Sequence, residues 1–275
     1  TGVQTCALPI YEKNNLYASL SNRGSWYNND FQWFMPAFDI KWKFAKQLTL
    51  IADVARVYRN PTLNDLYWQP GGNPNLKTES GWNQSAGIEV NHQTEKWKYQ
   101  LQSVAFYADV QNEIIWTPNQ TGLYTPQNVN ESKTTGVRTF ASIKRFWKSS
   151  NLNLWMNASY GNYLVKQNSS IKEYQDKIYT PHELYKWGLV YMYKKVQLNY
   201  YGSYVGYRFI TADNSSWVNP YLIHDATISY SFEIKNSDLQ FYIGCKNMLN
   251  ESYQIVSYRP MPGRSYQAGV RMVLK

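Results

Sequence analysis

Apolar and polar residues alternate along many short segments of this chain, and the connections between those segments are long and short in turn. The clearest segment is 152–160, in which Leu152, Leu154 and Met156 share one face. A period of two places the apolar side chains on one face of a β-strand and the polar ones on the other. Alternating long and short connections put every long loop on the same side of the sheet. The pattern therefore predicts an all-β, antiparallel fold.

About twelve such segments are expected, and most have the ~9–11 residues that a membrane strand needs. No apolar run approaches the ~18–20 residues of a membrane helix. Tyr (25 residues) and Trp (11 residues) are abundant, which suits the aromatic girdles of a transmembrane β-barrel. Such strands must close into a barrel, because an edge open to lipid leaves backbone groups unpaired. The expected strands are 15–23, 31–44, 47–58, 83–92, 98–112, 137–143, 152–160, 187–193, 197–207, 221–230, 239–247 and 265–274.

The longest interruption, residues 56–82, is too polar and too rich in Pro, Gly and Asn to continue either neighbouring strand. It is far longer than a hairpin turn, so we expect an ordered loop. Asn60-Pro61 and Pro70-Gly71 are typical turn pairs, and Glu79 is placed to pair with Arg59 or Lys77. These features favour a structural role. Further long loops are expected at 113–132, 163–182, 208–220 and 248–264.

The order of residues in this loop resembles the barrel signature of TonB-dependent outer-membrane receptors. That signature has an Arg-x-Pro-Thr-x-x-Glu-Leu run, a Gly-Asn-Pro-x-Leu core and a Lys-Pro-Glu ending. Two positions depart from it, since Asp65 stands for Glu and Thr78 for Pro. The matching positions are Arg59, Pro61, Leu66, Gly72, Asn73, Pro74, Leu76 and Glu79.

The C-terminal part carries the same resemblance. Asn247 and Tyr253 match the family's Asn-Leu-x-Asn-x-x-Tyr element, and Pro262, Gly263 and Arg264 match the opening of its last strand. Family members usually end on an aromatic residue, whereas this chain ends Val-Leu-Lys. The resemblance covers nearly everything after residue 10.

The resemblance implies a function as well as a fold. It implies a barrel of roughly 22 strands, of which this chain supplies about 12, with long extracellular loops and short periplasmic turns. The protein would lie in the bacterial outer membrane, in contact with its lipid. An N-terminal plug domain and a segment that contacts the TonB complex would precede the present residues. The implied function is active uptake of a scarce solute, such as an iron–siderophore complex, haem or cobalamin.

The first ten residues, TGVQTCALPI, read as a translated sequencing adapter. We therefore expect residues 1–10 to be a non-native scar and residues 11–275 to be the C-terminal half of the barrel, without its plug. The alternative is a genuine N-terminal segment. If residues 1–10 are foreign, Cys245 is the only native cysteine and no internal disulfide forms.

Ligand contacts are expected from aromatic and basic residues in the long loops. Aromatic rings could stack on a siderophore, a haem or a corrinoid, and cationic side chains could contact its acidic groups. The alternative is that the same residues pack the loops or belong to the interfacial girdle. The candidates are Trp116, Tyr124, Tyr174, Arg208, Trp217, Tyr258 and Arg259.

No catalytic constellation is evident in the sequence. His92, His182 and His224 are dispersed, and no metal-binding or nucleophile motif surrounds them. We expect neither an enzyme nor a resident cofactor or metal. The formal charge of +9 would fit nucleic acid, but Lys and Arg gather at turns and strand ends, so we expect no nucleic-acid partner.

Two other classes remain open at this stage. One is a passive outer-membrane barrel, such as a porin or an autotransporter. The other is a soluble all-β carbohydrate-binding module, which would bury one sheet face and expose the other.

Overall fold

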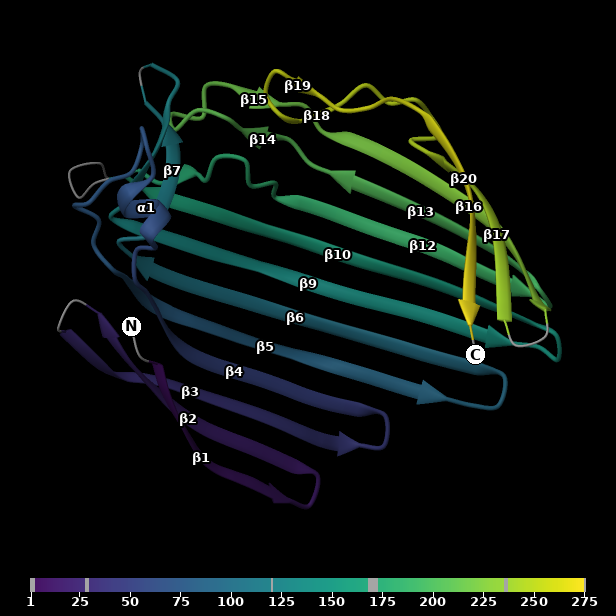
Figure 1. Ribbon diagram of the computed structural model, residues 1–275. Helices are drawn as coiled ribbons and strands as arrows, with labels where there is room; N and C mark the ends of the chain where they lie inside the picture. The colour runs from purple at the N-terminus through teal and green to yellow at the C-terminus, as the bar shows by residue number, and fades with distance from the viewer. Residues whose placement is uncertain (1–2, 28–29, 120, 168–172, 235–236, 275) are drawn as a thin grey trace.

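A single large antiparallel sheet dominates the chain (Figure 1). The computed structural model describes residues 3–27, 30–119, 121–167, 173–234 and 237–274. The strands of the main path follow one another in chain order, each paired with the next. They are β1 (Val3–Lys13), β2 (Leu16–Tyr27), β3 (Asp30–Ala45), β4 (Leu48–Arg59), β5 (Glu79–Gln93), β6 (Trp97–Gln111), β9 (Glu131–Phe146), β10 (Ser150–Lys166), β12 (Glu183–Tyr193), β13 (Val196–Val205), β16 (Tyr221–Ile234), β17 (Ser237–Lys246) and β20 (Ser265–Leu274).

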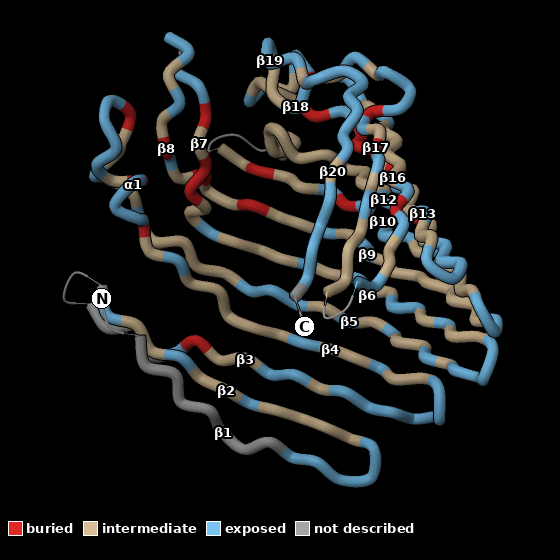
Figure 2. Tube along the Cα trace, turned by 45° about the vertical axis from the view of Figure 1, so that its right-hand side comes forward, coloured by how far each residue is buried: buried red, intermediate tan, exposed pale blue. Residues whose placement is uncertain are grey.

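The sheet curves around a concave face and stays open (Figures 1 and 2). Its two edges are β1 and β20, which do not pair with each other among the described residues. A membrane-spanning sheet needs closure to satisfy its edges. The open trough is therefore the arrangement expected of part of a transmembrane barrel.

The register gives the sheet one apolar and one polar face. Leu50 pairs with Ile88, Leu101 with Val90, and Leu154 with Leu189, so these side chains share the convex face. Many of them are exposed, among them Leu50, Ile88, Leu101, Leu154, Met156, Leu198, Ile228, Ile243 and Val270. An exposed apolar band that crosses this many strands is what a lipid-facing surface requires.

Buried apolar residues are few and lie mainly near one end of the trough (Figure 2). Ile115, Val129 and Val165 form the buried cluster of the described residues. A soluble sandwich would instead cover the apolar face of the sheet with a second layer. No element of the described part of the chain covers that face, which contradicts the sandwich alternative.

The twelve expected strands are all present, and most extend further than the alternation indicated. The expected strand 15–23 was too short, because Ser25 still pairs with Gln32 and Trp26 with Phe31. The expected strand 31–44 was one residue short at each end, since β3 runs from Asp30 to Ala45. One strand was not expected: β1 begins at Val3 and pairs with β2. This pairing does not decide the origin of residues 1–10, so the non-native scar stays a prediction.

The long connections contain small elements of their own. They are α1 (Leu63–Tyr67), the hairpin β7 (Ile114–Pro118) with β8 (Tyr124–Asn128), β11 (Gln175–Asp176), which pairs with β10, β14 (Arg208–Phe209) with β15 (Trp217–Val218), and β18 (Gln254–Val256) with β19 (Arg259–Pro260). The opposite end of the sheet has short turns. No helix among the described residues is long and apolar enough to cross a bilayer.

Candidate functional site

The connection between β4 and β5 is ordered by a short capped helix. The Thr62 hydroxyl accepts a hydrogen bond from the Asp65 backbone N–H at 3.1 Å, and the Asp65 carboxylate accepts one from the Thr62 N–H at 2.9 Å. This reciprocal pair is a capping box, with Asp where Glu or Gln is usual. The helix was not predicted, since one turn is too short to show helical periodicity.

Asp65 also ties this loop to the next one. Its carboxylate accepts the Trp116 indole N–H at 2.9 Å and lies 3.4 Å from Arg59 Nη1. Burial of Asp65 opposes its ionisation, but the hydrogen bonds from Thr62 and Trp116 outweigh burial and lower the pKa of Asp65. The ionised carboxylate is thus the junction between α1 and the β7–β8 hairpin.

Glu79 makes a second junction between the same loops. It pairs with Arg59, one of the two partners expected from the sequence, and accepts the Ile114 backbone N–H at 2.7 Å. The other candidate, Lys77, instead donates its backbone N–H to Asn128 Oδ1 at 2.7 Å. These contacts hold β7 and β8 against the start of β5.

The glycine and asparagine of the signature allow close backbone packing. A Cβ on Gly72 would lie 2.6 Å from the Trp68 nitrogen and 2.8 Å from the Leu66 carbonyl oxygen, so only glycine fits. The Asn73 N–H donates to the Asp65 carbonyl at 2.8 Å, and its side chain donates to the Pro126 carbonyl at 3.2 Å. Among the remaining signature positions, Pro61 is buried, Leu66 and Leu76 are half-buried, and Pro74 is exposed.

A second set of side-chain hydrogen bonds orders the connection between β17 and β20. Asn247 is buried, and its amide group both donates to the Glu251 carbonyl at 2.9 Å and accepts the Glu251 N–H at 2.8 Å. Tyr253 packs on Tyr221 with ring centroids 4.6 Å apart. The signature residues at this end therefore stabilise the loop.

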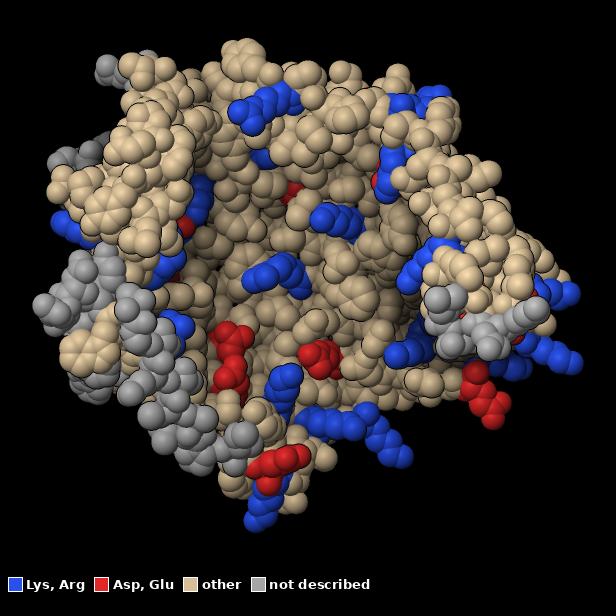
Figure 3. All heavy atoms as spheres, viewed as in Figure 1, with Lys and Arg blue, Asp and Glu red and all other residues tan. Residues whose placement is uncertain are grey.

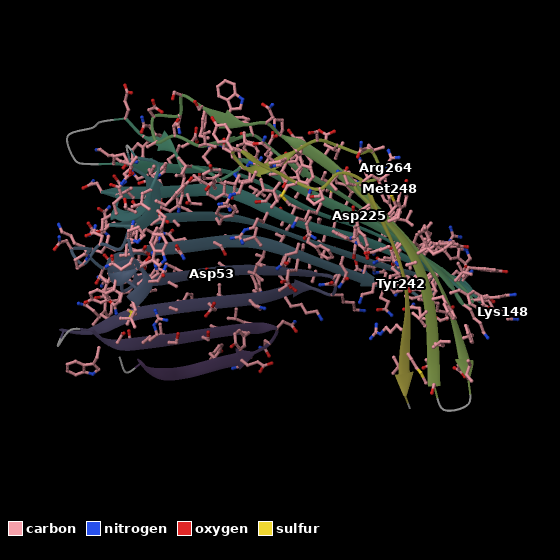
Figure 4. All side chains as sticks on the ribbon, turned by 45° about the horizontal axis from the view of Figure 1, so that its top comes forward. Asp53, Lys148, Asp225, Tyr242, Met248 and Arg264 are labelled. Carbon is pink, nitrogen blue, oxygen red and sulfur yellow. The ribbon has the colours of Figure 1, made fainter. Side chains whose placement is uncertain are left out.

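The Pro262–Arg264 segment takes part in the same set of hydrogen bonds. The Pro262 carbonyl accepts the Asn247 amide at 3.4 Å, and the Arg264 N–H donates to Asn250 Oδ1 at 2.8 Å. A Cβ on Gly263 would lie 2.8 Å from that oxygen. Figure 4 shows Asp225, Met248 and Arg264 close together at this end of the sheet.

Four of the seven candidate ligand contacts are exposed in the loops. Tyr258 is 92% exposed, Trp217 57% and Tyr124 37%, and Arg259 is exposed as well. The Tyr124 hydroxyl donates to that of Tyr179 at 3.4 Å, and partial desolvation of this hydroxyl together with the contact raises the pKa of Tyr124 to about 12. These four residues stay candidates for ligand contact.

The other three have partners within the protein. Arg208 is 4% exposed and donates to the Asn219 and Gln254 carbonyls at 3.2 and 3.1 Å. The expected position of Arg208 at a loop tip is therefore wrong, because its guanidinium is buried and links the backbone near residues 208, 219 and 254 by hydrogen bonds. Trp116 is half-buried against Asp65, and the Tyr174 hydroxyl donates to Glu131 at 2.6 Å.

The concave wall is a polar surface that the sequence reading did not single out. A hollow of about 600 Å³ is lined by Asp53, Gln102, Arg138 and Lys186, among others. Figure 3 shows charged side chains inside this hollow, and Figure 4 labels Asp53 on the wall. The sequence did contain a pattern that could have identified these residues, because they occupy the polar positions of the alternating strands. The wall offers charged and amide groups to a polar solute.

The histidines make separate hydrogen bonds. His92 contacts Gln47 at 2.5 Å, His182 Nδ1 contacts Asn162 Oδ1 at 3.2 Å, and His224 contacts Tyr200 at 2.5 Å. The other ring nitrogen of His182, Nε2, lies 2.7 Å from Asp176 Oδ1. Within the described residues, no group of three or more His, Cys, Asp or Glu side chains could hold a metal ion.

Comparison with known proteins identifies related sequences and folds. The family model described as "TonB dependent receptor-like, beta-barrel" matches residues 11–248. The chain is 26% identical over 245 residues to the vitamin B12 transporter BtuB of Photobacterium profundum, covering 88% of this chain and 37% of that protein. It is 34% identical over 88 residues to BtuB of Vibrio vulnificus, covering 32% and 14% of the two chains.

Among solved structures, the ferric enterobactin receptor PfeA in complex with BCV-L6 is similar in fold. Its TM-score is 0.72 at 16% sequence identity, and the alignment covers 98% of this chain and 45% of that one. The chain thus spans less than half the length of these relatives.

Proposed function

The chain belongs to the family of TonB-dependent receptors of the bacterial outer membrane, and we propose that the complete protein actively takes up a scarce solute. The family match over residues 11–248 carries this proposal. The related curated proteins are transporters by name. An apolar convex face and a charged concave wall suit a barrel that passes a polar solute through lipid.

Residues 11–275 would form the C-terminal half of a barrel of roughly 22 strands. The remainder of the barrel and an N-terminal plug would come from a preceding part of the protein, and residues 1–10 would be foreign to it. The lengths of the relatives support this division, since the chain covers 37% of one and 45% of another. The plug would contact the TonB complex, which supplies the energy for uptake.

The first solute to test is a corrinoid. Both curated relatives are vitamin B12 transporters by name. The exposed Tyr124, Trp217 and Tyr258 would stack on the flat faces of such a ligand, and Arg259 would meet its phosphate or amide groups. Iron–siderophore complexes and haem are the alternatives within the same function.

Uptake of labelled cyanocobalamin tests the proposal. The complete protein is expressed in cells that lack their own cobalamin receptor, with and without a functional TonB complex. We expect uptake that needs TonB and stops when a protonophore removes the proton gradient. Ferric siderophores and haem are measured in parallel under the same conditions.

Each outcome separates one part of the proposal from another. TonB-dependent uptake of a ferric siderophore or haem alone would retain active uptake and refute the corrinoid assignment. Entry of small polar solutes that does not depend on TonB would refute active uptake and favour a passive channel.

A further inference from the structure

The end of the sheet opposite the long loops carries an exposed basic rim. Four successive hairpin turns between β3 and β13 each present lysine, and we define the basic rim by the residues Lys46, Lys96, Lys148, Lys194 and Lys195. All five are exposed. Figure 4 labels Lys148 at the right-hand end of the sheet, and in Figure 1 the turn between β9 and β10 lies at the end opposite α1 and β7.

The positive charge of the basic rim is not balanced by ion pairs. Ion pairs in the described part of the chain join groups in the long loops or the strand ends beside them, such as Lys177 with Glu113 and Lys246 with Asp225. None involves a lysine of the basic rim. Several like charges along one edge repel one another, so an external anion would stabilise this end.

Arg145 lies on the convex face directly beside the basic rim. It pairs with Leu152 on one side and Trp97 on the other, which places all three on the apolar face. Its guanidinium carbon lies 4.7 Å from the ring centroids of both Trp97 and Trp147. Two indole rings thus hold the planar cation, and Arg145 Nε has no hydrogen-bond partner among the described atoms.

An aromatic row continues from this arginine along the convex face. Tyr99 stacks on Trp97 with centroids 5.7 Å apart, and His92 stacks on Tyr99 at 6.1 Å. Farther along the turns, Lys194 lies 5.4 Å from the Tyr193 ring. Aromatic side chains between an apolar band and a charged edge mark the level of lipid headgroups.

A hollow beside Lys46 adds space for an acyl chain or glycerol. Its volume is about 410 Å³, and its lining includes Leu48 and Val90, which pair with each other on the convex face. The same edge therefore combines a cation, aromatic rings and an apolar depression.

We propose that the basic rim together with Arg145 binds the phosphate of an anionic phospholipid, such as phosphatidylglycerol, in the leaflet that the short turns meet. The Arg145 guanidinium, oriented by Trp97 and Trp147, donates to the phosphate oxygens. The rim lysines attract the negative headgroup over a longer range. A zwitterionic headgroup fits less well, because its ammonium group would lie near the lysines. The proposal depends on the lipid-facing convex surface and not on the identity of the solute.

Retention of phospholipid by the complete receptor, measured by native mass spectrometry, tests this site. The receptor is titrated with phosphatidylglycerol or phosphatidylethanolamine, and the variant is Arg145→Gln. The matched control is Arg138→Gln, because Arg138 lies on the same strand, also over an aromatic ring, at 4.6 Å from the Phe106 centroid, but on the concave face.

We expect phosphatidylglycerol to bind in preference to phosphatidylethanolamine, and Arg145→Gln to weaken its binding about tenfold, as loss of a charged hydrogen bond does. Arg138→Gln should leave binding unchanged. Equal binding of the two lipids, or equal loss in both variants, would overturn the proposal.

A second variant keeps the test decisive if Arg145→Gln does not fold. Replacing Lys46, Lys96, Lys148 and Lys194 with glutamine changes only exposed turns. Binding of phosphatidylglycerol should weaken about fivefold for each lysine at low salt and less at high salt. Unchanged lipid selectivity in this variant would refute the role of the basic rim. Neither assay measures solute uptake, so each result is independent of the proposed transport function.

Discussion

Replacing Asp65 with alanine should release the connection between β4 and β5 from the β7–β8 hairpin while the sheet stays folded. The carboxylate accepts the Thr62 N–H at 2.9 Å, the Thr62 hydroxyl at 2.8 Å and the Trp116 indole at 2.9 Å. The side chain is buried, with 5% of the residue exposed. Its loss leaves the Trp116 donor unpaired and opens the cap of α1 at the same time.

The expected loss of loop stability in Asp65→Ala follows from these contacts. A hydrogen bond to a charged group contributes about 1.5–3 kcal/mol, and a helix cap about 1 kcal/mol. Contacts that share one carboxylate do not add in full. We therefore expect the free energy of loop opening to fall by about 3 kcal/mol, which raises the open fraction roughly 150-fold.

Amide hydrogen exchange at Asn73 measures this opening, because its N–H donates to the Asp65 carbonyl oxygen at 2.8 Å. Exchange should accelerate roughly 150-fold in Asp65→Ala. Trp116→Phe, which removes only the indole donor, should give an increase of about tenfold. The control Leu63→Ala lies on the same helix at an exposed position and should change exchange little. An unchanged Asn73 amide in Asp65→Ala would refute the role assigned to this carboxylate.

Three further predictions concern the loops. The pKa of Asp65 lies below its ordinary value of 3.8, so the ionised carboxylate stabilises the loop above pH 3.8 and this stabilisation is lost as the pH falls through the lowered pKa. Hydrogen exchange at the Asn73 amide should accelerate over that pH range in the wild type but not in Asp65→Ala. Asn247→Ala leaves the Glu251 backbone N–H and carbonyl unpaired and should lower the stability of the loop at 247–264 by about 2–3 kcal/mol. Proteolysis within this loop should then be faster, and a variant cleaved as slowly as the wild type would contradict the prediction. Ultraviolet titration should find one tyrosine with a pKa of about 12 that Tyr124→Phe removes, and a full complement of ordinary tyrosines would contradict it.

The sequence was most informative about the strands. Alternation at Leu152, Leu154 and Met156 is a local property, and it predicted both the strand and the face on which its apolar side chains lie. The pairing of Glu79 with Arg59 was also predictable, since opposite charges flank one loop. The register followed from the alternation because a shift of one residue would turn every apolar side chain inward.

The contacts between loops could not be predicted in the same way. Asp65 and Trp116 are 51 positions apart, and no local pattern links them. Arg208 resembles an exposed loop cation in the sequence, but it is buried and donates to the carbonyl groups of Asn219, in its own loop, and of Gln254, 46 positions away. The polar wall at Asp53 and Arg138 became a candidate surface only when the curvature of the sheet brought its strands around one hollow.

Spin-label accessibility along β10 and β16 tests the central claim most directly, namely that one face of each strand meets hydrocarbon and the other a wet interior. Labels are placed at Leu154 and Ile228 on the convex face, and at Asn157 and Thr227 on the concave face, of the complete protein in lipid bilayers. We predict that oxygen, which dissolves in lipid, dominates relaxation at Leu154 and Ile228, and that a water-soluble nickel complex dominates at Asn157 and Thr227. Equal accessibility of both faces to the nickel complex would contradict the barrel assignment and the uptake function built on it.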